Sequence, residues 1–130
     1  MQFSGLHHVA IIASDYPRSK HFYTEVLGLP VIAEAYREAR DSWNLDLRLA
    51  DDMQIELFSF PAPPPRVSRP EACGLRHLAL RVADIEEAVR HLQQHGVEVE
   101  AIRVDEYTGK RFTFFADPDG GSLGLMSVVA

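Results

Sequence analysis

Apolar and polar positions follow the same order twice along the chain. Short apolar segments rich in strand-forming residues at 6–13 and 75–82 predict strands. Apolar residues then recur at helical spacing over 19–27 and 85–95, which predicts one helix after each strand. Three more strands are predicted after each helix, at about 31–37, 43–50 and 53–60 in the first half and 97–104, 110–116 and 122–128 in the second.

Capping and turn residues support these boundaries. Asp15 and Asp84 stand where a helix N-cap belongs, just before the two helical stretches. Each stretch then runs into a glycine, Gly28 or Gly96, which is typical of a helix end. The sequence DPDGG at 117–121 has strong turn chemistry and separates the last two predicted strands.

The chain contains an internal repeat. GLHHVA at 5–10 matches GLRHLA at 74–79, and IELFS at 55–59 matches LGLMS at 123–127. A repeat of this length predicts two copies of one supersecondary unit. We therefore expect one α+β domain over 1–130, made of two tandem βαβββ modules with pseudo-twofold symmetry. The modules are expected at about 5–60 and 74–128, joined by a Pro-rich linker at 61–70.

The repeat brings two histidines and a glutamate into one hypothesis. His8 and His77 lie at matching positions, each two residues before an alanine on the same predicted strand face. Glu56 shares a largely apolar face, where a carboxylate needs a partner. A divalent metal held by His8, Glu56 and His77 would be that partner; these ligand types suit Zn, Ni, Co, Mn or Fe. Taken singly, each residue also fits an ordinary solvent-facing or hydrogen-bonded role. His7 is expected to face away.

Composition and charge narrow the partners. The 130 residues are 46% hydrophobic and 25% charged, with a formal net charge of −6, which is typical of a soluble globular protein. Basic residues form no stripe, so nucleic acid and anionic membranes are not expected partners. With no signal peptide or membrane-spanning run in view, a cytoplasmic location and a small-molecule partner are expected. The single cysteine, Cys73, excludes an internal disulfide and is expected to be at least half-buried.

Basic and aromatic residues near the predicted third-strand regions are candidates for substrate binding. Arginine is suited to capture a carboxylate or phosphate through two hydrogen bonds, so a modestly anionic substrate is expected. The alternating charges of YREARD also fit a solvated sheet edge. The basic candidates are Arg37, Arg40, Lys110 and Arg111, and the candidates for an apolar wall are Trp43, Tyr107 and Phe112.

Several segments together resemble the vicinal oxygen chelate superfamily, and within it the glyoxalase I-like (lactoylglutathione lyase-like) proteins. The resemblance covers nearly the whole chain and rests on LHHVAIIASD, FYTEVLGL, IELFSF, GLRHLALRVADI and FFADPDG. YREARDSW, SRPEACGLRH and YTGKRFTFF are similar to a bacterial subgroup of small glyoxalase-like proteins. The resemblance implies the glyoxalase/bleomycin-resistance/dihydroxybiphenyl dioxygenase fold, a divalent metal cofactor and a homodimer.

The resemblance also implies four metal ligands. His8, Glu56 and His77 match the first three, whereas Gly124 occupies the place of the fourth, normally a glutamate. Gly124 is also the repeat mate of Glu56. The implied activity is that of a metal-dependent lyase or isomerase acting on a small oxo compound or its thiol adduct, with Glu56 as the catalytic base. Glycine accepts no proton, and losing a general base costs a factor of roughly 10² to 10⁴ in rate, so classical glyoxalase I activity is not expected at full strength.

Two alternatives stay open from the sequence. The first is a non-catalytic small-molecule or metal-binding protein of the same fold, which Gly124 favours. The second is an iron-dependent dioxygenase, because two histidines and one carboxylate match the facial triad of such enzymes. It ranks lower, since the oxygenases of this superfamily usually take their carboxylate from the last strand. The sequence does not decide whether the site forms within one chain or across a dimer.

Overall fold

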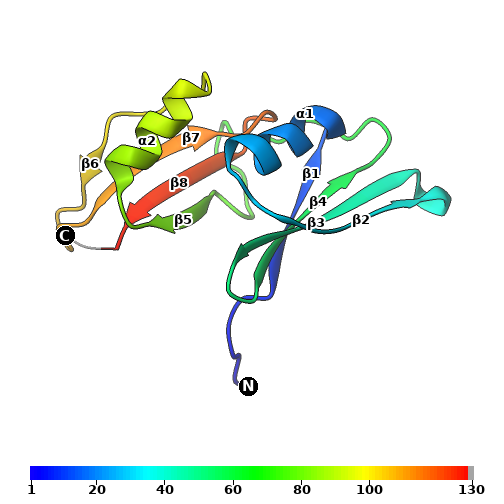
Figure 1. The fold of residues 1–130 in the computed structure, drawn as a ribbon, viewed down its shortest axis with the longest axis horizontal. Helices are drawn as coiled ribbons and strands as arrows, with labels where there is room; N and C mark the ends of the chain where they lie inside the picture. Colours follow the sequence, from blue (N-terminus) through cyan, green and yellow to red (C-terminus); the bar gives the residue numbers. More distant parts are fainter. Residues whose placement is uncertain (129–130) are drawn as a thin grey trace. The chain divides into compact units, whose positions relative to one another are not determined.

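The computed structural model describes residues 1–128 and divides between Pro65 and Arg66, inside the Pro-rich segment, into two compact units. Figure 1 shows both. The first unit contains β1 (His8–Ala13), α1 (Tyr16–His21), the π-helical turn η1 (Phe22–Val26), β2 (Val31–Arg37), the 3₁₀ turn η2 (Glu38–Arg40), β3 (Ser42–Ala50) and β4 (Met53–Ser59). The second contains β5 (Leu78–Val82), α2 (Ile85–Gln94), β6 (Arg103–Val104), β7 (Arg111–Ala116) and β8 (Ser122–Ser127).

The two units have the same sheet topology. Strand order is β1-β4-β3-β2 in the first sheet and β5-β8-β7-β6 in the second. In each sheet the first and last strands of the unit pair in parallel, and the remaining neighbours pair antiparallel. The parallel pairing needs a crossover, which the single helix of each unit supplies. The predicted α+β class and the tandem βαβββ arrangement are confirmed.

Both helices are capped by the residues that the sequence predicts. The Asp15 carboxylate accepts a hydrogen bond from the Arg18 amide at 3.2 Å, and the Asp84 carboxylate accepts one from the Glu87 amide at 3.0 Å. Gly28 and Gly96 have φ of +74° and +75°, a left-handed conformation that glycine adopts without steric cost. These caps set α1 and α2 across one face of their sheets.

The buried side chains come from the helices and from the facing side of each sheet. In the first unit they include Tyr23, Leu45, Leu47, Ile55 and Leu57, each with no exposed surface. In the second unit the buried hydrophobic residues are Ile85, Leu92, Phe115, Leu123 and Leu125. Because side chains alternate across a strand, this core fixes which residues reach the opposite, helix-free face.

Some element bounds differ from the prediction. The first helix starts earlier, at Tyr16, because the Asp15 cap and Pro17 favour that position, and it continues as η1. The predicted strand 97–104 shortens to Arg103–Val104 plus one bridge from Val99 to Phe115. There the Thr113 hydroxyl donates to the Glu100 carbonyl at 2.7 Å, and such a side-chain bond competes with a regular ladder.

Two further observations bear on the expectations from composition. None of the helices within residues 1–128 combines the length and apolar character needed to cross a bilayer. Cys73 is exposed, so the expectation that it is at least half-buried is wrong. The short segment around it, residues 70–77, forms neither helix nor strand, and hydrophobicity alone does not reveal that.

Candidate metal centre

Strand register places Glu56 in a row of three side chains on the helix-free face of the first sheet. Its chain neighbours Ile55 and Leu57 are fully buried on the other face. Glu56 pairs with Ala10 on β1 and with Asp46 on β3. The row Ala10–Glu56–Asp46 therefore holds two carboxylates beside a small alanine.

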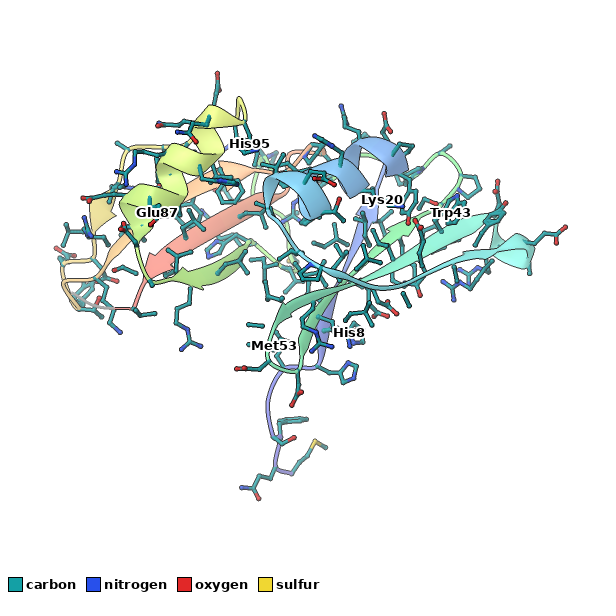
Figure 2. The ribbon with its side chains drawn as sticks, in the orientation of Figure 1. His8, Lys20, Trp43, Met53, Glu87 and His95 are labelled. Atoms are coloured by element: carbon teal, nitrogen blue, oxygen red, sulfur yellow. The ribbon has the colours of Figure 1, made fainter. Side chains whose placement is uncertain are left out.

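His8 supplies the direct partner of Glu56. His8 Nε2 lies 2.6 Å from Glu56 Oε2, and the side chains are 41% and 21% exposed. His8 begins β1 two residues before Ala10, so it lies on the face that carries Glu56. Figure 2 labels His8 at this end of the sheet, near Met53 at the start of β4. The predicted pairing of His8 and Glu56 on one face is what the first unit contains.

The ring of His7 also reaches His8. The two Nδ1 atoms are 2.8 Å apart, and the rings meet edge to face with centroids 5.1 Å apart. The expectation that His7 faces away is wrong, because β1 starts at His8 and strand alternation does not extend to His7. When His8 Nε2 donates to Glu56, His8 Nδ1 is the acceptor for His7. When His8 Nε2 binds a metal, Nδ1 is the donor.

The donor set of this pair fits a divalent metal. An imidazole nitrogen and a carboxylate oxygen converge from neighbouring strands, as in zinc and iron sites. Within residues 1–128 no group of three or more His, Cys, Asp and Glu side chains is arranged to hold a metal ion. His8 and Glu56 thus form a half-site.

The third predicted ligand, His77, belongs to the second unit. It directly precedes β5 and is exposed. Its ring packs edge to face on Phe114 of β7, with centroids 4.9 Å apart. This contact fixes the ring through an apolar neighbour, in contrast to the carboxylate partner of His8.

The second sheet repeats the row of the first at the same register. Ala79 pairs with Gly124, and Gly124 pairs with Phe114. The row Ala79–Gly124–Phe114 thus corresponds to Ala10–Glu56–Asp46, and Gly124 is the structural equivalent of Glu56. A Cβ on Gly124 would lie 3.0 Å from Phe114 Cε1 and 3.4 Å from Ala79 Cβ. The Phe114 ring therefore fills the space where a side chain at 124 would begin.

Two of the predicted substrate-binding residues lie on the Glu56 face. The Arg37 guanidinium carbon is 5.4 Å from the Phe58 ring centroid, and that of Arg40 is 5.5 Å from the Phe60 centroid. Phe58 and Phe60 are nearly parallel, with centroids 6.0 Å apart. Phe58 shares the face of Glu56 because it follows two residues later on β4.

The other predicted substrate residues are placed differently. Arg111 makes an ion pair of 2.6 Å with Glu86 of α2, on the helix-covered side. Tyr107 is 89% exposed in a turn whose amides bind the Asp105 carboxylate. Lys110 follows that turn and is exposed. Trp43, labelled in Figure 2, stacks on Tyr16 of α1 and so does not share the Glu56 face.

Two residues of the helix-free faces were not anticipated. Arg103 lies over two rings of the second sheet, 4.9 Å from the Phe112 centroid and 5.9 Å from that of Phe114. Asp46 stands opposite Glu56 and accepts a hydrogen bond from the Asn44 amide at 3.3 Å. Alternation in NLDLRL already puts Asp46 opposite to the buried leucines, which was the signal available in the sequence.

An ion-pair cluster joins α1 to β2 away from the half-site. The Tyr16 hydroxyl donates to Glu34 at 2.6 Å, and Lys20 Nζ lies 2.9 Å from both Glu34 oxygens. These hydrogen bonds hold the pKa of Glu34 below its usual range, and the one from Tyr16 has the larger effect. Burial, together with the adjacent carboxylate, raises the pKa of Tyr16. The cluster ties the helix to the sheet edge.

Comparison with known proteins identifies the family. The model of the Glyoxalase/Bleomycin resistance protein/Dioxygenase superfamily matches residues 5–123. The chain is 63% identical over 120 residues to the Escherichia coli (strain K12) uncharacterized protein YaeR, covering 92% of this chain and 93% of that protein. It is 33% identical to the 2-epi-5-epi-valiolone epimerase of an Actinomyces species, over 97% of this chain and 80% of that protein.

A solved structure agrees with the sequence match. The glyoxalase family protein from Enterococcus faecalis has a TM-score of 0.89 and 48% identity, over 97% of this chain and 99% of that chain. The family model, the relatives and the two four-stranded sheets all point the same way. The chain belongs to the Glyoxalase/Bleomycin resistance protein/Dioxygenase superfamily.

Proposed function

We propose that the protein is a metal-dependent lyase or isomerase that moves a proton next to the carbonyl of a small oxo compound or its thiol adduct. The observation that carries the proposal is the 2.6 Å contact between His8 Nε2 and Glu56 Oε2 on a helix-free sheet face. His77 is the proposed third ligand, on the basis of the repeat. The metal is Zn, Ni, Co, Mn or Fe. A homodimer is part of the same proposal.

Glu56 is the proposed base. When bound, the metal would polarise a substrate oxygen and stabilise negative charge on it. Glu56 contacts His8 through Oε2, so Oε1 is the oxygen proposed to accept a proton from the carbon next to the substrate carbonyl. The same atom can deliver a proton to the neighbouring carbon, and exchange of the proton on Glu56 with solvent would place deuterium there in D₂O. In the metal-free protein His8 orients the carboxylate through Oε2.

A single base limits the stereochemistry. Gly124, at the equivalent place of the second sheet, accepts no proton. Removal and return of a proton by one group keep it on one face of the substrate, whereas inversion at carbon requires a second proton donor on the other face. The relative named as an epimerase supports an oxo-type substrate. The row containing Gly124 favours a shift between adjacent carbons over epimerisation.

A second candidate is a non-catalytic binding protein of the same fold. It is favoured by the Phe114 ring, which fills the space beside Gly124 and gives the second sheet an apolar surface in place of a ligand. Such a protein would bind metal or a small molecule without moving a proton. The two candidates therefore differ in proton exchange.

The test measures metal binding and proton exchange on one preparation. Metal-free protein is titrated with Co²⁺, whose absorption spectrum reports coordination, and incubated in D₂O with the hemithioacetal of methylglyoxal and a thiol. We expect one Co²⁺ per chain and deuterium incorporation at the substrate carbon.

His8→Ala and His77→Ala should each weaken Co²⁺ binding at least tenfold. His95→Gln is the matched control, because His95 bonds to its own helix carbonyl at His91. Binding that is unaffected by either substitution would refute the ligand set. Binding without exchange would favour the second candidate.

A further inference from the structure

Two arginine side chains pack against two stacked phenylalanine rings beside the half-site. Arg37 lies against Phe58 and Arg40 against Phe60, at 5.4 and 5.5 Å from the ring centroids. The rings are tilted by only 14° and their centroids are 6.0 Å apart. Two positive groups are thus held against neighbouring rings at one end of the face that carries Glu56.

The backbone explains how Arg37 gets there. Arg37 ends β2 opposite Ser42 on β3, and Asn44 on β3 pairs with Phe58 on β4. To reach Phe58, the Arg37 side chain crosses β3, so it lies along the sheet while the residue stays exposed. Ser42 is small and fully buried, and a larger residue there would obstruct this path. Stacking on an aromatic face holds a guanidinium plane while leaving its N–H edge free.

The positive charges of Arg37 and Arg40 are not paired with a carboxylate in the part of the chain that the structure describes. Within residues 1–128, neither Arg37 nor Arg40 has an ion-pair partner, although the chain as a whole carries a net charge of −6. By contrast, Arg103 and Arg111 each pair with a glutamate at 2.9 and 2.6 Å. Two positive groups on neighbouring rings repel each other, and an anion bound between them would offset that repulsion.

We propose that Arg37 and Arg40, carried on Phe58 and Phe60, form the subsite for an anionic group of the substrate. Because it names the substrate class of the same site, this inference rests on the proposed function. Phe58 follows Glu56 by two residues, which is about 7 Å along a strand. The substrate is therefore an oxo compound whose carboxylate or phosphate lies about two peptide units from the carbon that Glu56 deprotonates.

The test uses metal-free protein, so it does not depend on catalysis. Inorganic phosphate and succinate are titrated separately at constant ionic strength, and the Arg Nε–H signals are followed by NMR. We expect saturable shifts at Arg37 and Arg40. Arg37→Gln and Arg40→Gln should each weaken binding of the preferred anion about tenfold, as expected for loss of a charge-assisted contact. Arg37→Lys keeps the charge and loses the planar fork, so it should weaken binding about threefold. The anion that binds more tightly identifies the group as phosphate or carboxylate.

Arg48→Gln is the matched control. Arg48 lies on the same sheet face, and its guanidinium donates to the Asp51 carbonyl at 2.6 Å with no aromatic support. It should leave anion binding unchanged. Equal weakening by Arg48→Gln, or no saturable shift at Arg37 and Arg40, would overturn the subsite. Anion binding that depends on Arg37 in a protein without proton exchange would uphold the subsite and refute the proposed function. Exchange of a hemithioacetal whose thiol carries a carboxylate, with no effect of Arg37→Gln on KM, would uphold the proposed function and refute the subsite.

Discussion

The two sheets have the same strand register, but the equivalent rows of side chains differ in chemistry. In the first, the row Ala10–Glu56–Asp46 is acidic, and its glutamate contacts His8 at 2.6 Å. In the second, the row Ala79–Gly124–Phe114 is apolar, and its aromatic ring packs on His77. The equivalent strands thus carry the proposed metal ligands His8 and Glu56 in the first unit and an aromatic surface in the second.

The difference shows that electrostatic repulsion between carboxylates is present in the row of the first sheet and absent from the equivalent row of the second. Like charges directly opposite each other on neighbouring strands are destabilising, and Glu56 faces Asp46 in that way. A cation beside the first row relieves this repulsion, whereas the second row has none to relieve. The acidic row of the first sheet therefore lowers the stability of the metal-free protein, whereas the apolar row of the second sheet contributes to packing.

The largest expected effect comes from removing the proposed base, Glu56. Glu56→Gln keeps the size of the side chain but cannot accept a proton, so proton exchange should fall by a factor of about 10² to 10⁴. Deuterium incorporation into the hemithioacetal measures this. Fold integrity is checked by circular dichroism. Exchange at the wild-type rate would show that Glu56 is not the base.

Placing a glutamate at position 124 should lower the stability of the fold. Gly124→Glu places a Cβ 3.0 Å from the Phe114 ring, and overpacking of this kind destabilises by about 1–3 kcal/mol. Thermal and urea unfolding measure the loss. The double variant Gly124→Glu/Phe114→Ala makes room for the side chain, so it should bind Co²⁺ more tightly than Phe114→Ala alone. A fully stable Gly124→Glu would contradict the account of the Phe114 ring.

Asp46→Asn should have a smaller effect, because it removes only the charge opposite Glu56. It removes the repulsion opposite Glu56, so the metal-free protein should gain about 0.2–1 kcal/mol in the free energy of unfolding. The same change removes a nearby negative charge and should weaken Co²⁺ binding. Urea unfolding with and without Co²⁺ measures both. Lower stability without metal would show that the hydrogen bond from Asn44 outweighs the repulsion.

The smallest effect concerns the ties between helix and sheet. The pKa of Glu34 is lowered in the folded state, so its contribution is present above the unfolded pKa and is lost as the pH falls through the folded value. Lys20→Met should therefore reduce stability by about 0.2–1 kcal/mol at pH 7 and by less near pH 3. The corresponding tie in the second unit, Glu86 to Arg111, gives the comparison through Glu86→Gln. A pH-independent loss for Lys20→Met would rule out the electrostatic explanation.

The sequence by itself determined the order of elements and the equivalence of the rows. Alternation and the repeat predict that His8 and Glu56 share a face and that Gly124 matches Glu56, and the strand register agrees. Such features depend on local periodicity and on pairing between neighbouring strands, and both are written in residue spacing.

Only the tertiary structure decided how side chains reach beyond their own strand. The Phe114 ring beside Gly124, the Arg37 side chain lying across β3 and the Arg111 pair with α2 each join residues from different elements. The His7 contact with His8 depends on where β1 begins. Strand periodicity fixes the face on which a side chain starts, but the position of a long side chain's end depends on the volume left by neighbours that are distant in sequence.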